Sequence, residues 1–118
     1  MVGESAGLNF NGGAPVALTD GAMNTNEGCL TISDSIGNHL FYTDGVNVWD
    51  RNHVQMPNGT GLLGHASSTQ SALITSQPGS NNIFYIFTTP APVSWNIGPG
   101  IILSLTASQK PAVPIRLL

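Results

Sequence analysis

Five consecutive residues place five different functional groups side by side near the middle of the chain. They are Trp49, Asp50, Arg51, Asn52 and His53, which supply an aromatic ring, a carboxylate, a guanidinium, an amide and an imidazole. Binding residues concentrate on loops that a rigid scaffold holds in place. An aromatic ring beside amide and charged groups suits the recognition of sugars. The stretch is therefore the predicted binding site, although Trp49 taken alone suits a core position in a sheet better than a ligand platform.

Other residues permit catalytic arrangements, but none has a diagnostic pattern. Asp50, His65 and either Ser67 or Ser68 supply the side chains of a hydrolytic triad, yet the G-x-S-x-G elbow is absent. A glycoside hydrolase needs two carboxylates facing one cleft. The acidic side chains mostly stand in turn-forming contexts; they are Glu4, Asp20, Glu27, Asp34, Asp44 and Asp50. We therefore predict no catalytic residue and a non-enzymatic chain. A hydrolase domain of a secreted polysaccharide-degrading protein remains the alternative.

The histidines and acidic turns do not form a metal-binding motif. His39, His53 and His65 are widely spaced, whereas zinc ligands usually occur as close pairs on one element. The stretch from Asp34 to Asn38 resembles part of a calcium loop but lacks the alternating acidic ligands and the distal glutamate. A hairpin turn explains this stretch better. The sequence predicts neither a metal nor a cofactor.

Charge and hydropathy exclude two classes of partner. Charged residues make up 8% of the chain, and the only cations are Arg51, Lys110 and Arg116. Nucleic-acid binding requires several clustered cations, so it is not expected. A membrane-spanning helix needs about 20 consecutive apolar residues, and no run approaches that length. The sequence therefore predicts no nucleic-acid partner and no membrane span.

The elements that must position the binding stretch are short strands. Apolar runs at 29–32, 39–43 and 46–49 are separated by residues that favour turns, which is the pattern of an antiparallel meander. Asp44-Gly45 is the dipeptide typical of a type I′ turn, in which both central residues take positive φ. The runs at 71–76 and 82–89 flank a second turn around Pro78-Gly79. Weaker strand patterns lie in 5–13 and 15–19.

The whole chain is predicted to be all-β. Leu40, Phe41 and Tyr42 place large side chains on both faces of one strand, which favours stacked sheets over a single open sheet. We expect one further strand at 101–105, a β-propeller-like unit over 1–107 and an irregular tail over 108–118. A propeller blade needs about 40–50 residues, so the chain has room for two to three blades only. Such a fragment leaves unpaired edges, and unpaired edges recruit other chains.

Most of the chain, from about Ala6 to Thr89, resembles a known family. The blocks NEGC, LFYTDG, VWDRNH, MPNGTGLLG and SSTQS carry the resemblance. They are similar to the N-terminal region of large secreted proteins of gliding bacteria. Those proteins end in a gliding-motility-associated, type B sorting domain that the type IX secretion system reads.

The resemblance implies a β-propeller-like module of an exported, cell-surface protein. Its role would be adhesion or recognition, with glycans, other surface proteins or the rest of its own longer chain as partners. The chain itself shows no signal peptide and no sorting domain, and after Thr89 it departs from the family pattern. A truncated fragment without independent function is therefore a further alternative. The family offers no catalytic residue to transfer onto these positions.

Overall fold

Seven short strands make up the regular structure in the computed structural model, which describes residue 1 and residues 3–89 of the 118-residue chain. The strands are β1 (Gly7–Asn9), β2 (Val16–Leu18), β3 (Leu30–Ser33), β4 (His39–Thr43), β5 (Val48–Asp50), β6 (Ala72–Ser76) and β7 (Phe84–Thr88). This part of the chain contains no α-helix. It is all-β, as the alternation of apolar runs and turns predicts.

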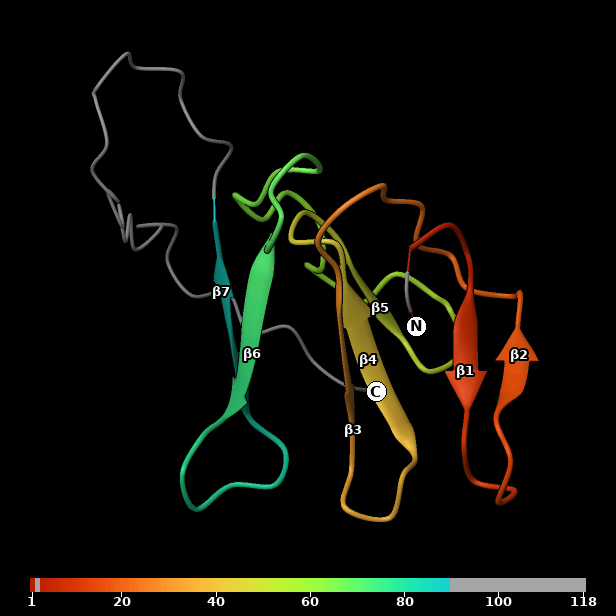
Figure 1. Ribbon diagram of the computed structural model, residues 1–118. Coiled ribbons are helices and arrows are strands. Elements are labelled where there is room, and N and C mark those ends of the chain that lie inside the picture. Colours follow the sequence, from red (N-terminus) through yellow and green to blue (C-terminus); the bar gives the residue numbers. More distant parts are fainter. Residues whose placement is uncertain (2, 90–118) are drawn as a thin grey trace, which may run out of the picture.

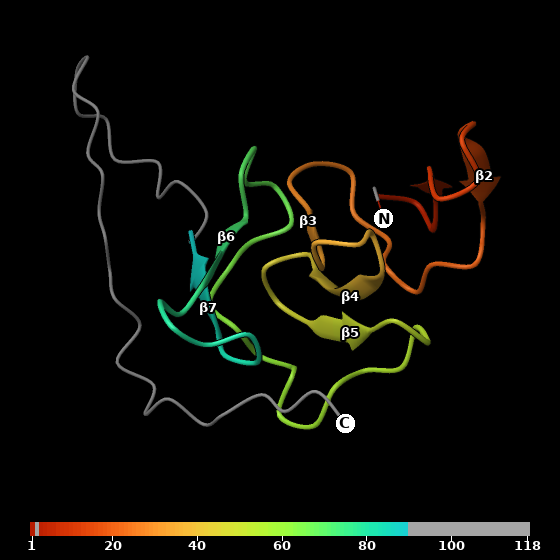
Figure 2. The same ribbon diagram turned by 90° about the horizontal axis from the view of Figure 1, so that it is seen from below.

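The strands form three small antiparallel sheets, each made from neighbours in sequence. β1 pairs with β2, β4 lies between β3 and β5, and β6 pairs with β7. Figures 1 and 2 both show the three-stranded sheet between the two hairpins. β4 is thus the central strand of the central sheet. None of the three sheets that the described residues form closes on itself.

Aspartate side chains shape the turns of the central sheet. The predicted turn at Asp34–Asn38 is confirmed, with Gly37 at φ +89°. The type I′ prediction for Asp44-Gly45 is wrong, because only Gly45 takes a positive φ there. The Asp44 carboxylate instead accepts the backbone N–H groups of Val46 and Asn47, at 2.8 and 2.7 Å. That side-chain turn lengthens the loop to residues 44–47, and β5 consequently begins at Val48 and not at Val46.

An apolar core lies between the central sheet and the β6–β7 hairpin. Its buried members are Phe41, Val48 and Met56. Phe41 meets Phe84 of β7 edge to face, with ring centroids 5.3 Å apart. Such aromatic pairs contribute about 0.5–1.5 kcal/mol beyond the apolar area they bury. The contact stacks one sheet on the next, as the large residues on both faces of β4 predict.

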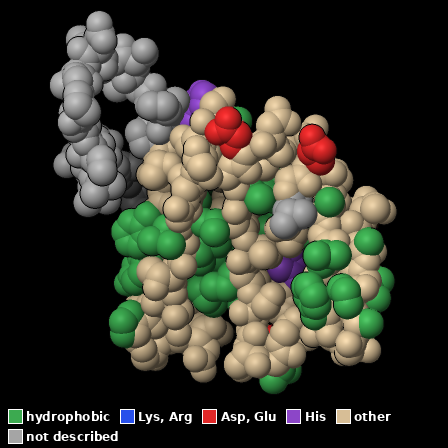
Figure 3. Space-filling view, in the orientation of Figure 1, with side chains coloured by type: hydrophobic (Ala, Val, Ile, Leu, Met, Phe, Trp, Pro, Cys, Tyr) green, Lys and Arg blue, Asp and Glu red, His purple; other side chains and the backbone are tan. Residues whose placement is uncertain are grey.

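The two outer hairpins expose apolar side chains. Over β6 and β7 these are Leu73, Tyr85 and Phe87, each about half exposed, and over β1 and β2 they include Leu8 and Val16. Figure 3 shows hydrophobic side chains gathered over both hairpins. Residues 73, 85 and 87 share the face of the hairpin opposite to the core. The β6–β7 end of the stack therefore presents an apolar face, whereas Leu8 and Val16 lie on opposite faces of the β1–β2 hairpin.

Two of the predictions from sequence concern residues that the structure does not describe. The strand expected at 101–105 and the boundary between 1–107 and 108–118 both lie outside the described residues. Within the part that is described, no helix is long and apolar enough to cross a membrane.

Candidate functional site

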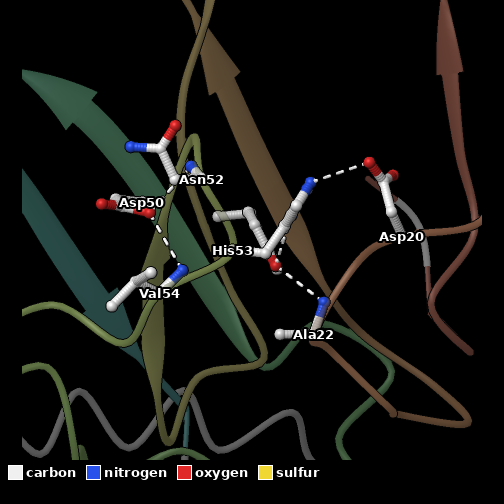
Figure 4. A network of polar contacts seen from close by, with 7 residues as sticks. Asp20, Ala22, Asp50, Asn52, His53 and Val54 are labelled. Atoms are coloured by element: carbon white, nitrogen blue, oxygen red, sulfur yellow. Dashed lines mark hydrogen bonds and ion pairs between the residues drawn. The ribbon is translucent and has the colours of Figure 1, made fainter.

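The predicted binding stretch forms a tight turn at the end of β5. Asp50 N–H donates to the Val54 carbonyl at 2.9 Å, and His53 N–H donates to the Asp50 carbonyl at 3.1 Å. The Asp50 carboxylate also accepts the N–H groups of Asn52 and Val54, at 2.8 and 3.0 Å (Figure 4). A bridge between Trp49 and Gln55 closes the base of the turn. The carboxylate of Asp50 is therefore occupied in holding its own loop.

His53 occupies the position of the turn that requires left-handed backbone geometry. Its φ is +63°, in a region that costs a residue with a side chain roughly 1–2 kcal/mol. A type I turn followed by one left-handed residue is a common three-residue hairpin connection, usually completed by glycine. A histidine in this place needs compensating contacts.

Those contacts come from Tyr42 and Asp20. His53 Nδ1 lies 3.0 Å from the Tyr42 hydroxyl, and Nε2 lies 3.4 Å from the Asp20 carboxylate. The same hydroxyl accepts the Ala22 N–H at 2.9 Å. All groups are satisfied when Tyr42 donates to Nδ1 and the ring proton sits on Nε2, facing Asp20. Figure 4 shows this network joining the turn to the segment that leads out of β2.

Tyr42 lies at the centre of a group of stacked rings. Its side chain is fully buried, and burial raises its pKa even though the Ala22 N–H bond acts in the opposite direction. Trp49, its partner across β4 and β5, stacks on it with centroids 5.4 Å apart. His39 stacks on it at 5.3 Å. Burial also lowers the pKa of His39, which favours a neutral ring at neutral pH. This face of the central sheet is aromatic and polar.

The five predicted binding residues thus divide into two kinds. Trp49, Asp50 and His53 make the structural contacts of the turn, through ring stacking and hydrogen bonds. Arg51 and Asn52 are exposed at its tip. The amide of Asn52 lies on the side of the turn away from Asp20 (Figure 4). The part of the site open to a ligand is the Arg51–Asn52 tip, with half-buried Trp49 at its base.

His65 and Asp50, two members of the alternative catalytic set, are engaged in local contacts. The His65 ring accepts the backbone N–H of Ser67 at 3.1 Å, so the histidine contacts the peptide and not a serine hydroxyl through this bond. The Asp50 carboxylate is engaged in its own turn. Among the described residues, no three His, Cys, Asp or Glu side chains gather as metal ligands.

Sequence reasoning did not find a polar hollow of about 320 Å³ between two connecting segments. It is lined by Asn24, Thr25, Asn26, Glu27, Ala66 and Ser67. Gly28 N–H donates to the Ser68 carbonyl at 3.1 Å and joins these segments. The run of polar residues from 24 to 27 is the only sequence signal for the hollow, and it equally predicts a solvated connection.

Comparisons of the chain with protein-family models, with curated proteins and with solved structures find no match. The geometry of the turn, the exposed apolar face of β6–β7 and the family resemblance of the sequence are the observations that bear on function.

Proposed function

We propose that the chain is a non-enzymatic recognition module of an exported, cell-surface protein. In this proposal the three sheets belong to a partial β-propeller, and the Arg51–Asn52 tip contacts the ligand. The observation that carries it is the left-handed backbone of His53, which a side-chain network holds in place at the base of an exposed polar tip. Strained positions fixed by their surroundings cluster at functional sites.

The turn is organised before any ligand arrives. Asp50 fixes the backbone on both sides of the tip, and Tyr42 and Asp20 fix the histidine that follows it. A tip already held in its bound shape loses less conformational entropy on binding. Arg51 and Asn52 then offer hydrogen-bond donors and an amide carbonyl to solvent.

Glycans are the ligand class that these groups suit best. Sugar hydroxyls both donate and accept hydrogen bonds, and a guanidinium beside an amide serves both roles. The half-buried Trp49 ring at the base of the tip adds apolar surface for a sugar ring. The family resemblance supports the cell-surface location, where glycans and other surface proteins are the available partners.

The exposed apolar face of the β6–β7 hairpin supports membership of a larger stack. Leu73, Tyr85 and Phe87 leave an apolar face that a further sheet would cover. The rest of a longer chain is therefore a partner in this proposal, together with the external ligand. The Phe41–Phe84 contact is the internal example of how one sheet stacks on the next.

A glycan array tests the ligand class and the site together. The wild-type chain is compared with the Arg51→Ala/Asn52→Ala double variant and with Ser35→Ala/Ile36→Ala, the matched change at the Asp34–Asn38 turn. Loss of hydrogen bonds to a charged and an amide group should weaken binding on the order of ten-fold or more. The control pair should bind as wild type. No array signal for the wild-type chain contradicts glycan recognition, and equal binding by the tip variant contradicts the site.

A further inference from the structure

A cluster of amide and hydroxyl side chains lies beside Trp49 on the central sheet. Gln55 Nε2 and Thr60 Oγ1 both donate hydrogen bonds to Asn47 Oδ1, at 3.3 and 2.9 Å. Gln55 Nε2 also donates to the Gly59 carbonyl at 3.4 Å. Gln55 and Thr60 are exposed, and Asn47 is half-buried. These three side chains form the Asn47 cluster.

The cluster and the Trp49 ring share one face of the central sheet. Trp49 pairs with Tyr42 on one side and with Gln55 on the other. Paired residues point their side chains to the same face of a sheet, and so do residues two positions apart on a strand. Asn47 therefore lies on the face of Trp49, in agreement with its bond to Gln55. The half-buried Trp49 ring, stacked on Tyr42, has the polar cluster beside it.

The backbone that carries the cluster is fixed along the edge of β5. Met56 N–H donates to the Val48 carbonyl at 2.9 Å, and Val48 N–H donates to the Gly59 carbonyl at 2.7 Å. Gly59 N–H in turn donates to the Met56 carbonyl at 2.8 Å. The Met56 side chain belongs to the buried core. The loop 55–60 is thus held in place without a ligand, which reduces the conformational entropy lost on binding.

The bonds within the cluster determine which groups remain for a ligand. Asn47 Oδ1 already accepts two hydrogen bonds, and the Asn47 amide N–H groups point away from it. These N–H groups and Gln55 Oε1 make no hydrogen bond within the described part of the chain. Thr60 Oγ1 directs its proton to Asn47 and keeps lone pairs that can accept. Donors and acceptors therefore stand beside an aromatic ring, the combination that suits the hydroxyl edge and apolar face of a sugar.

We propose that the Asn47 cluster, with the adjoining Trp49 ring, is a second sugar subsite, and that the ligand is an oligosaccharide of two or more rings. The inference rests on the proposed function, in which the first ring occupies the Arg51–Asn52 tip. Asn47 and Arg51 flank β5, so roughly 13 Å of strand separates them. That span exceeds one sugar ring. A second ring linked to the first binds without a second full loss of translational and rotational freedom, so contacts at the cluster raise the affinity for longer glycans.

The length of the glycan separates this subsite from the tip. An array carrying single neutral hexoses and their short oligomers is probed with the full wild-type chain and with Gln55→Ala/Thr60→Val. The matched control is Thr75→Val/Gln77→Ala, the same two changes in the β6–β7 hairpin. The wild-type chain should bind the oligomers more tightly than the single sugars. The cluster variant should lose that difference, on the order of ten-fold, and keep its affinity for single sugars, and the control should bind as wild type.

Three results would overturn the subsite. The wild-type affinity does not rise with glycan length, or the cluster variant binds oligomers as tightly as wild type, or it loses single sugars and oligomers equally. The NMR signal of the Gln55 side-chain amide supplies a test that needs no variant. It should shift when an oligomer is added and stay in place with a single sugar, and an unmoved signal in both cases contradicts the proposal.

Failure of the proposed function gives a different pattern. Absence of any array signal for the wild-type chain removes glycan recognition, and the subsite with it. Unchanged binding of single sugars by Arg51→Ala/Asn52→Ala removes the tip as the first subsite. A chain that loses single sugars in the tip variant, but whose oligomer binding ignores the Asn47 cluster, keeps the proposed function and loses only the second subsite.

Discussion

Two turns of the central sheet have the same backbone frame. In Asp34–Asn38 and in Asp50–Val54, the first aspartate accepts two backbone N–H groups, from the residues two and four positions later. In each, the fourth residue donates its N–H to the carbonyl of the aspartate, and the aspartate N–H donates to the carbonyl of the fifth. One carboxylate thus organises each loop by the same geometry.

The two turns differ at the left-handed position. The first has Gly37 at φ +89°, which glycine adopts without steric cost, and the second has His53 at φ +63°. Gly37 contributes only its carbonyl to a tertiary contact, an exposed 3.3 Å hydrogen bond from Asn11. His53 instead connects its turn to buried Tyr42 and to Asp20. The second turn therefore has a strained backbone at His53, and the contacts of the His53 side chain fix the orientation of the turn.

The largest effect is expected from breaking the contact that distinguishes the second turn. Tyr42→Phe removes the hydroxyl that bonds His53 Nδ1 and accepts the Ala22 N–H. It leaves two part-buried polar groups without that partner, which should lower the free energy of unfolding by about 1–3 kcal/mol. Urea denaturation measures the loss. Tyr85→Phe, at a half-exposed ring, is the control and should change stability little. Equal losses in the two variants would show that the network does not fix the turn.

A smaller effect on stability is expected from the backbone strain of His53, considered apart from the contacts of its side chain. His53→Ala and His53→Gly both delete the imidazole, but only glycine relieves the left-handed backbone. The glycine variant should therefore be more stable than the alanine variant, by roughly 1 kcal/mol. Thermal and urea unfolding of both variants measure this difference.

Gly37→Ala gives the converse test at the first turn. Alanine at φ +89° introduces there the strain that His53 already carries, and should lower the free energy of unfolding by about 1 kcal/mol. An added Cβ would also approach the Asn11 side-chain oxygen, which is the flexible end of an exposed side chain and is free to move. If the alanine and glycine variants at position 53 are equally stable, the strain is not part of the difference between the turns.

The comparison of the two turns shows how much of the structure can be predicted from the sequence alone. Aspartate followed by glycine three residues later predicts the first turn, because each residue has a local role there. Nothing local marks His53 as left-handed, since histidine at this position is held by Tyr42 and Asp20, eleven and 33 residues away in sequence. The strands at 39–43 and 72–76 follow from apolar runs between turn residues. The contacts of His53 with Tyr42 and Asp20 cannot be predicted from the spacing of these residues in the sequence.

Two further features of the structure could not be predicted from local sequence. The Asp44-Gly45 pair has the sequence of a type I′ turn, but the Asp44 side chain bonds the backbone ahead of it and selects a longer loop. Sequence reasoning grouped Trp49 to His53 by chemical type, and the structure divides them by exposure. Exposure depends on which side chain a neighbouring segment covers, and that segment, at Asp20 and Ala22, comes from another part of the chain.

The smallest expected effect concerns the fifth position of each turn. In the first turn Asn38 donates its side-chain N–H to the Asp34 carboxylate at 2.9 Å, whereas Val54 in the second turn has no side-chain donor. That bond, with the backbone N–H groups of Asn38 and Ile36, holds the pKa of Asp34 below its ordinary value of 3.8. Asn38→Val gives the first turn the fifth residue of the second. It should raise the pKa of Asp34 towards 3.8, as followed by NMR titration of the carboxyl carbon.

The lowered pKa of Asp34 also determines how the stability of the fold changes with pH. A carboxyl whose pKa is lower in the folded than in the unfolded chain stabilises the fold above about pH 3.8, and the contribution is lost as the pH falls through the folded value. Asn38→Val should therefore lose less stability than wild type on acidification below pH 3.8. Ser35→Ala, which leaves the carboxylate bonds in place, should titrate as wild type. An unchanged Asp34 pKa in Asn38→Val would mean that the backbone N–H groups alone hold the charge, and the fifth residue would then not distinguish the two turns.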